Sequence, residues 1–326
     1  MSRIQGKTIS PQLPTDQVYV GIDVSKSHLD VHLHPSGVAR RVANDKAGLQ
    51  VLARFLRPCA PQLIVLEATG QYHRLAQRHL HDAGFNVAVV NPFRTRRFAD
   101  MLGQLAKTDM IDARTLALYA AMVRPETKTP PAPDQVDLAA ILVARRQVSQ
   151  QRAMLNNQLD SAEHTLVRRQ IRARITMAER HLAALDAEIR LIVRSRPALK
   201  HRYDILTSVP GIGMITAATM IAELDELGDA KASQIAALVG VAPMNCDSGA
   251  FRGQRRIRGG RASVRNTLYM AAVAAVRSKG DIATFYQRLR DSGKPFKVAI
   301  TAVIRKLAVI ANTLITENRK WQPQRP

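Results

Sequence analysis

Four acidic residues in the first third of the chain have the types and the spacing that metal-dependent chemistry requires. Asp23 and Glu67 each end an apolar run, and Asp109 and Asp112 lie three residues apart. On a helix that spacing places both carboxylates on one face. Carboxylate oxygens are the ligands that Mg²⁺ and Mn²⁺ prefer, and a pair of such ions can stabilise the attacking and leaving oxygens of a phosphoryl transfer. We therefore predict that these four residues form a magnesium or manganese site.

Each of these residues also has a plainer interpretation. An Asp that ends a strand is commonly a cap or turn residue, and an acidic pair three residues apart is commonly a solvated helix face. Their order along the chain favours the metal site, because a strand Asp, a strand Glu and a helical Asp-x-x-Asp within one basic domain follow the layout of ribonuclease-H-like nucleases.

Strand and helix patterns indicate the elements that must position these side chains. Apolar runs and alternating patterns predict strands, and one stretch of helical periodicity lies between two of them. The predicted strands are Val18–Asp23, Leu29–His34, Gln62–Glu67 and Phe85–Val90, and the predicted helix is Tyr72–Ala83. Alternating strands and helices predict an α/β domain over residues 17–125, preceded by a flexible leader, residues 1–16.

Four prolines between Pro125 and Pro133 mark a boundary after this domain. Beyond it, in residues 126–200, apolar residues recur at alternating steps of four and three from Ile171 to Ile192. This heptad pattern predicts a coiled coil. Its partner is either a helix of the same hairpin or a second subunit, and we favour self-association.

Residues 201–326 should form a mostly α-helical domain. Apolar residues from Phe296 to Leu314 step by four and three, which predicts one amphipathic helix. The turn Pro210–Gly213 separates two helical runs, and it is either a plain connection or a hairpin whose backbone amides approach phosphate.

The formal net charge of +22 indicates a polyanionic partner, and nucleic acid is the usual one. A merely basic protein is the alternative. Cys59 and Cys246 are the two cysteines, so we predict neither disulfides nor a zinc site, and the pairs His32/His34 and His79/His81 lack further ligands. Apolar stretches such as Leu268–Val276 are short for a membrane span. We expect a cytoplasmic protein with no membrane partner.

Several short motifs resemble those of the DEDD transposases of insertion sequences, and they follow one another in the same order over nearly the whole chain. The motifs are Val20–Lys26, Leu66–Tyr72, Val90–Pro92, Lys107–Arg114, Pro210–Gly213, Leu238–Pro243, Asp247–Gly249 and Leu268–Met270. The resemblance implies a RuvC-like domain, a coiled coil and a C-terminal transposase domain. It also implies recombination of donor and target DNA guided by a structured bridge RNA, and dimers that assemble into a tetramer.

The same resemblance implies that Ser248 is the nucleophile and forms a covalent phosphoserine with DNA. Serine needs activation before it attacks, and an arginine-rich stretch follows it that could hold a strained phosphate. The arginines expected to bind nucleic acid are Arg252, Arg255, Arg256, Arg258, Arg261 and Arg265. From the residues alone, Asp247–Gly249 could be an ordinary turn, and Cys246 and Ser263 are alternative nucleophiles that we rank below Ser248.

A DNA transposase that uses the four carboxylates together with Ser248 is thus the function we expect. One alternative is a RuvC-like nuclease whose carboxylates activate water and whose Ser248 is a turn residue. Another is a non-catalytic nucleic-acid-binding protein built on basic surfaces and the coiled coil.

Overall fold

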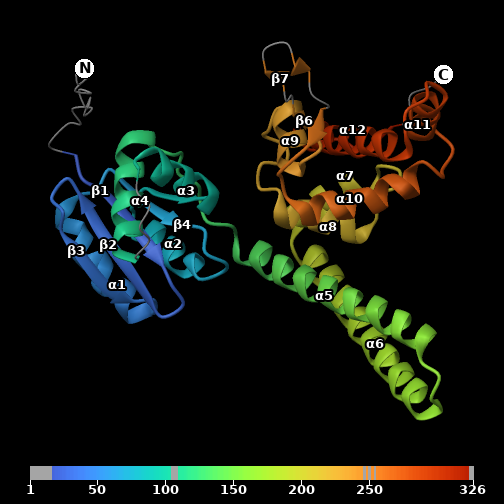
Figure 1. Ribbon diagram of the computed structural model, residues 1–326, viewed down its shortest axis with the longest axis horizontal. Coiled ribbons are helices and arrows are strands. Elements are labelled where there is room, and N and C mark those ends of the chain that lie inside the picture. Colours follow the sequence, from blue (N-terminus) through green and yellow to red (C-terminus); the bar gives the residue numbers. More distant parts are fainter. Residues whose placement is uncertain (1–16, 104–108, 245–246, 249–250, 253–254, 323–326) are drawn as a thin grey trace, which may run out of the picture. The chain divides into compact units, whose positions relative to one another are not determined.

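The computed structural model describes residues 17–103, 109–244, 247–248, 251–252 and 255–322. The chain divides into two units, Met1–Pro130 and Pro131–Pro326 (Figure 1). The division falls inside the proline-rich stretch, because proline there prevents the helices on either side from continuing through it. The helices predicted as a separate middle segment group with the C-terminal unit.

The first unit contains a five-stranded mixed sheet in the order β3-β2-β1-β4-β5 (Figure 1). Strand β1 is antiparallel to β2 and parallel to β4, and β4 is parallel to β5. The strands are β1 (Tyr19–Val24), β2 (His28–His34), β3 (Ala39–Ala43), β4 (Leu63–Glu67) and β5 (Val87–Val90). The four predicted strands are confirmed, while β3, with its two adjacent arginines, was not expected.

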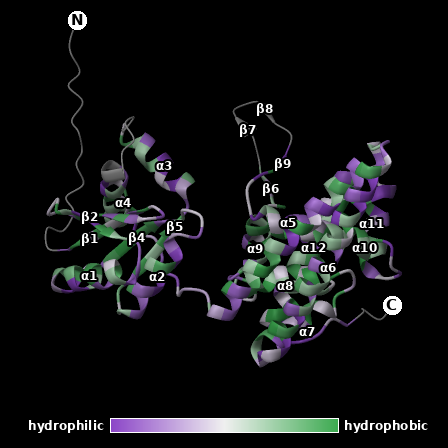
Figure 2. Ribbon diagram, turned by 90° about the horizontal axis from the view of Figure 1, so that it is seen from below, coloured by the Kyte–Doolittle hydropathy of each residue, from purple (hydrophilic) through white to green (hydrophobic). Residues whose placement is uncertain are grey.

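Helices cover both faces of this sheet because successive side chains of a strand point to opposite faces. On one face, α1 and α2 bury Leu49, Leu52 and Leu80 against the strands. On the other, Phe98 of α3 and Leu116 of α4 join a second core. The helices are α1 (Lys46–Leu56), η1 (Arg57–Cys59), α2 (His73–Asp82), α3 (Pro92–Met101) and α4 (Asp109–Val123). Figure 2 shows α1 and α2 with hydrophobic and hydrophilic residues interleaved along each helix. This arrangement is consistent with a RuvC-like α/β domain.

The second unit begins with an antiparallel helical hairpin formed by α5 (Pro133–Ser161) and α6 (Thr165–Ser195) (Figure 1). The predicted apolar seam of α6 packs inside this hairpin, with Ile171, Leu182 and Ile189 buried. Helix α5 of the same chain packs against this seam, which is the internal-hairpin alternative, and self-association stays a prediction. Sequence periodicity identifies the apolar stripe of a helix but not the chain that covers it.

The remaining helices pack around one large core that also includes the base of the hairpin, through Leu138 and Leu142 of α5. These helices are α7 (Pro197–Thr207), α8 (Met214–Glu223), α9 (Ala232–Val239), α10 (Ala262–Ala275), α11 (Asp281–Asp291) and α12 (Phe296–Thr316). The predicted turn Pro210–Gly213 lies between α7 and α8, and the predicted C-terminal amphipathic helix is α12.

Helix α12 corrects one expectation from the sequence. Its 21 residues, with a mean hydropathy of 1.8 in their most apolar stretch, are long and apolar enough to cross a membrane by length and composition. Half of that stretch is buried inside the second unit, where Val303, Leu307 and Ala311 are part of the core. The apolar character of α12 is thus accounted for by packing within the protein.

Candidate functional site

Strands β1 and β4 place Asp23 and Glu67 beside each other at one edge of the sheet. The two strands are parallel, with Ile22 opposite Leu66, so Asp23 and Glu67 are the next residues along each strand. Ile22 and Leu66 belong to the core under α1 and α2. Because side chains alternate along a strand, Asp23 and Glu67 point to the opposite face, which α3 and α4 cover.

Helix α4 crosses that face antiparallel to β1. At its C-terminal end, the guanidinium of Arg124 lies 5.8 Å from the ring centroid of Tyr19, at the start of β1. In the middle, α4 approaches so closely that a Cβ on Gly21 would overlap the carbonyl oxygen of Ala113 and the nitrogen of Ala117. The N-terminal turn of α4 therefore lies toward the end of β1 that carries Asp23.

That N-terminal turn begins at Asp109, whose side chain lies outside the described residues. Asp112 lies four residues before Leu116, which is buried against the sheet, so Asp112 is on the sheet-facing side of α4. The structure thus brings Asp23, Glu67 and the first turn of α4 to the same edge of the sheet. Within the described part of the chain, no three His, Cys, Asp or Glu side chains already form a metal cluster.

Glu67 has a hydrogen-bond donor that sequence reasoning missed. The Thr95 hydroxyl donates to Oε2 of Glu67 at 2.7 Å, and Thr95 is buried. Helix α3 brings Thr95 there because it begins immediately after β5, with Pro92 in its first turn and the Asn91 side chain accepting from the nitrogen of Phe93. Both features favour a helix start at this point. The sequence signal is the Asn-Pro pair after a predicted strand, which fixes where α3 begins.

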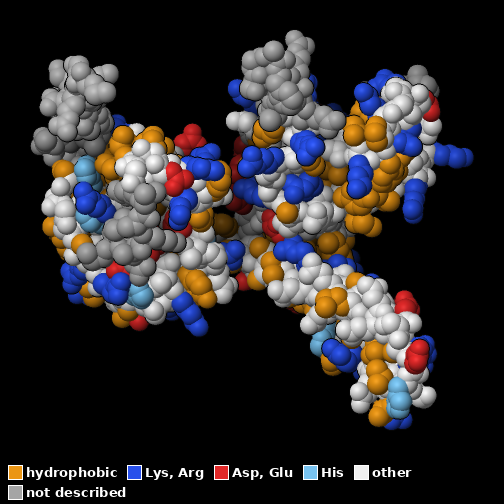
Figure 3. Space-filling model, in the orientation of Figure 1, with side chains coloured by type: hydrophobic (Ala, Val, Ile, Leu, Met, Phe, Trp, Pro, Cys, Tyr) orange, Lys and Arg blue, Asp and Glu red, His pale blue; other side chains and the backbone are white. Residues whose placement is uncertain are grey.

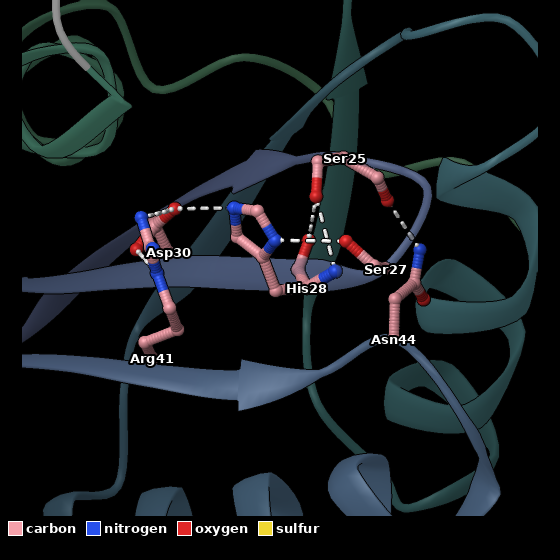
Figure 4. Close-up of polar contacts among 6 residues, drawn as sticks. All are labelled: Ser25, Ser27, His28, Asp30, Arg41 and Asn44. Atoms are coloured by element: carbon pink, nitrogen blue, oxygen red, sulfur yellow. Dashed lines mark hydrogen bonds and ion pairs between the residues drawn. The ribbon is translucent and has the colours of Figure 1, made fainter.

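A fifth carboxylate, Asp30 of β2, lies directly opposite Asp23 in the strand register. Its two oxygens accept from Nε and Nη2 of Arg41 at 2.7 and 2.9 Å, and Nε2 of His28 lies 3.4 Å from Oδ2 (Figure 4). Asp30 is buried, so this bidentate pair compensates its charge. Pairing with Arg41 makes Asp30 a poor candidate for a further metal ligand.

Polar contacts around the β1–β2 turn hold this part of the sheet in shape (Figure 4). Oγ of Ser27 lies 3.0 Å from Nδ1 of His28, the Ser25 hydroxyl donates to the His28 carbonyl oxygen, and Asn44 Nδ2 donates to the Ser25 carbonyl oxygen. The turn between β1 and β2 is thus tied to Asn44, which directly follows β3, while Arg41 of β3 holds Asp30 of β2.

The histidines His32 and His34 lie on the same face of β2 as Asp30. Burial lowers the pKa of His32, and the charge of Arg114 and the neighbouring His34 lower it further. Burial and Arg114 also lower the pKa of His34. Both imidazoles are therefore neutral at neutral pH, and they add no positive charge beside the carboxylates.

Ser248 lies on a short β-hairpin between α9 and α10 of the second unit. Two antiparallel strand pairs form this hairpin. At its base, β6 (Pro243–Met244) pairs with β9 (Arg256–Ile257), and nearer its tip, β7 (Asp247–Ser248) pairs with β8 (Phe251–Arg252). Ser248 is opposite Phe251 in the register. The side chains of Ser248 and Arg252, and the whole of Cys246, lie outside the described residues.

The base of this hairpin is closed by backbone contact and by two arginines. Gly240 lies so close to the Gly259 carbonyl oxygen that a Cβ would overlap it. Arg261 makes a bidentate pair with Glu226 at 2.6 and 3.1 Å. Arg265 donates to the Gly259 carbonyl oxygen at 2.7 Å. These two arginines therefore hold the hairpin in place, whatever they also bind.

Three other arginines expected to bind nucleic acid, Arg255, Arg256 and Arg258, are exposed on the same hairpin. The alternative nucleophile Ser263 lies on α10, where its hydroxyl donates to Glu223 of α8. Nη1 of Arg146 lies 3.4 Å from the other oxygen of Glu223. Ser263 thus belongs to a contact that joins three helices.

Comparison with known proteins bears on both units. A family model described as a transposase (DEDD, IS110 type) matches residues 20–164, and a model of the IS116/IS110/IS902 transposase family matches residues 203–287.

The chain belongs to the IS110 family of transposases.

Curated relatives of this family agree with the assignment. The chain is 26% identical to the pilin gene-inverting proteins of Moraxella bovis and Moraxella lacunata, over 94% of its own length and 98% of theirs. It is also 25% identical to an uncharacterized protein of insertion element IS110 from Streptomyces coelicolor, over 47% of this chain and 37% of that protein. Membership of this transposase family makes the chain a DNA-processing enzyme that acts in recombination.

In this IS110-family transposase the carboxylates belong to the first unit and Ser248 to the second. The first family model contains Asp23, Glu67, Asp109 and Asp112 and extends through α5 of the second unit, and the second model contains Ser248. The roles of these five residues stay predictions.

Proposed function

We propose that this transposase cleaves and rejoins DNA strands through a covalent phosphoserine at Ser248, with Asp23, Glu67, Asp109 and Asp112 as a divalent-metal site. The convergence of Asp23, Glu67 and the first turn of α4 at one edge of the sheet carries the proposal. Hard carboxylate oxygens suit Mg²⁺ or Mn²⁺. When bound, such an ion supplies positive charge beside the phosphate that reacts.

The proposed reaction conserves phosphodiester bonds. Oγ of Ser248 forms a bond to the phosphorus, the bond from phosphorus to one sugar oxygen breaks, and that oxygen leaves as a hydroxyl with a proton. A hydroxyl of another strand then attacks the phosphoserine, and the Ser248 hydroxyl is restored. Because one phosphodiester replaces another, strand exchange needs no external energy source. The printed name of the Moraxella relatives, a gene-inverting protein, is in keeping with such exchange.

Arginines on the same hairpin support the proposed role of Ser248 as the nucleophile. Arg255, Arg256 and Arg258 are exposed close to it along the hairpin, and guanidinium groups bind phosphate oxygens and stabilise charge that develops in the transition state. Arg261 and Glu226 form an ion pair at the base of the hairpin that carries Ser248. The four carboxylates belong to the first unit and Ser248 to the second.

Trapping of the covalent intermediate tests the proposal. The full chain is incubated with DNA carrying the element ends and Mg²⁺, quenched in denaturant and resolved for protein–DNA adducts. We expect an adduct with the native chain and with Ser263→Ala, the matched serine control, and none with Ser248→Ala. Asp23→Ala should bind DNA but neither cleave it nor form the adduct.

The alternatives give different results in the same assay. If Ser248→Ala cleaves DNA and the native chain forms no adduct, the protein is a nuclease that uses water. If the native chain and Asp23→Ala both bind DNA and neither cleaves it or forms an adduct, the protein is a non-catalytic binding protein. An adduct that disappears only in Cys246→Ser would move the nucleophile to Cys246.

We further propose that a structured bridge RNA guides donor and target DNA, and that dimers assemble into a tetramer. The net charge of +22 supports an extensive polyanionic partner. Purification of the chain with its flanking non-coding transcript tests this part: strand exchange should be lost on RNase treatment and restored by added transcript, and light scattering of the complex gives the number of subunits.

A further inference from the structure

Helix α3 has two different sides beside Glu67. Its inner side buries Thr95 and Phe98, and Thr95 donates to Glu67. Its outer side exposes an aromatic ring: Phe93 is 61% exposed. The guanidinium carbon of Arg97 lies 5.3 Å from the centroid of that ring. A single exposed phenylalanine is common on protein surfaces, but here a cation lies over the ring, and the same helix contacts a predicted catalytic carboxylate through Thr95.

The position of Phe93 relative to Glu67 follows from the chain. Strand β5 is parallel to β4, with Val90 opposite Glu67, and α3 begins two residues after Val90. Phe93 is two residues from Thr95, so their Cα atoms are no more than about 7–8 Å apart. Phe93 therefore lies on the same turn of α3 as the hydroxyl that contacts Glu67, with its ring on the outer side of the helix.

The charge of α3 also fits a nucleic acid. Arg94, Arg96 and Arg97 stand against one acidic residue, Asp100. Asp100 lies 3.6 Å from Arg97 and 3.9 Å from Arg96, and such exposed pairs are weak. Both arginines can exchange Asp100 for phosphate oxygens at little cost. On the face of this unit that Figure 3 shows, the coloured Lys and Arg side chains are spread out rather than gathered in one place.

We propose that Phe93, flanked by Arg97, is a stacking platform for an unpaired base of the DNA strand that reacts at the carboxylates. Aromatic rings accept any base on their faces, and an arginine beside the ring adds a cation contact and a phosphate contact. A base within a duplex is already stacked on both sides, so the platform selects a strand that has been opened. The inference rests on the proposed function, because that function places a DNA strand at Glu67.

Binding measurements with the full chain test the platform separately from cleavage. Fluorescence anisotropy gives the affinity for a labelled single strand, for the same strand as a duplex, and for strands with one abasic position. Phe93→Ala should weaken single-strand binding about 5- to 150-fold, the range expected for one stacked base, and leave duplex binding nearly unchanged. Phe93→Trp should retain the native affinity. Met101→Ala, on the same helix and 66% exposed, is the matched control and should have no effect.

Abasic strands identify the partner of the ring. The native chain should lose affinity at one abasic position, whereas Phe93→Ala should be insensitive to the same change. Equal losses for single strand and duplex, or equal abasic effects in both proteins, would overturn the platform. So would an effect confined to RNA strands, or a Phe93→Ala chain that changes only its oligomeric mass. Failure of the native chain to cleave would instead contradict the proposed function and leave these binding results intact.

Discussion

A hydroxyl from one element fixes the carboxylate of another at the edge of the sheet. Thr95 of α3 donates to Oε2 of Glu67 at 2.7 Å. A carboxylate that accepts such a bond is held in one orientation. Its other oxygen then remains available to bind a metal ion. Groups that orient metal ligands in this way commonly matter almost as much as the ligands themselves.

Replacement of Thr95 by valine tests this positioning role. Valine keeps the branched shape and burial of threonine but removes the donor, so Mn²⁺ affinity of the full chain should fall by about 10- to 100-fold. Thr95→Ser keeps the hydroxyl and should restore most of the affinity. The measurement is titration with Mn²⁺, followed by the electron paramagnetic resonance signal of the free ion.

A buried threonine in the second unit provides the control for this substitution. Thr219 of α8 is similarly buried, and Thr219→Val should leave Mn²⁺ binding unchanged. If Thr95→Val binds Mn²⁺ like the native chain, Thr95 has no positioning role. If the native chain binds no Mn²⁺ at all, the metal site itself is wrong.

Among individual residues, the sequence could identify those that end strands. It could not identify those that other elements bring to the site by tertiary packing. Asp23 and Glu67 were identified because each follows an apolar run, and the strand register places them together as expected. Thr95 and Asp30 were missed because their importance arises from contacts with Glu67 and Arg41, and those contacts depend on tertiary packing.

Among the elements, the crossing of α4 over β1 determines where Asp109 and Asp112 can lie. Gly21 permits that crossing, because any side chain there would overlap the backbone at Ala113 and Ala117. The requirement is for space rather than for an unusual backbone conformation. Close packing of this kind transmits a local change directly to neighbouring elements.

Gly21→Ala should therefore both destabilise the first unit and separate the carboxylates. We expect the free energy of unfolding in urea to fall by about 3 kcal/mol, the upper end of the range for an overpacked core, and Mn²⁺ affinity to fall with it. Gly37→Ala is the control. Gly37 has φ of 75°, but a Cβ added there would meet no atom within 4 Å, so alanine costs only about 1–2 kcal/mol of backbone strain. An equal loss of stability in both variants, without loss of Mn²⁺ binding in Gly21→Ala, would contradict the role of this crossing.

The sequence predicts whether a segment is a helix or a strand better than it predicts which elements pack against each other. The strands, the helix α2 and the C-terminal helix α12 follow from hydrophobic periodicity, which depends only on local geometry. The pairing of α6 with α5 does not follow, since an apolar stripe can be covered by any helix of matching shape. Strand β3 escaped prediction because it lies at the edge of the sheet and exposes Arg40 and Arg41, so it lacks an apolar run.

Across the whole molecule, the positive charge is carried by exposed side chains as well as by internal pairs. Both exposed and internally paired arginines occur on the β-hairpin that carries Ser248. Arg261 and Arg265 are bonded within the protein, whereas Arg255, Arg256 and Arg258 are exposed. Only positive charges that contact phosphates displace counterions from DNA. The exposed arginines should therefore determine how the DNA-binding constant depends on salt concentration.

Replacement of Arg255, Arg256 and Arg258 together by glutamine tests this distinction. Each phosphate contact contributes about 0.9 to the slope of the logarithm of the DNA-binding constant against that of the salt concentration, so the slope should become shallower by about 2 to 3. The control replaces Lys46, Arg54 and Arg57, which are exposed on and just after α1, by glutamine. Helix α1 covers the face of the sheet opposite Asp23 and Glu67, so this equal loss of charge should leave the slope nearly unchanged. Equal slopes for the two triple variants would mean that binding responds to net charge alone, and that the hairpin arginines make no direct phosphate contacts.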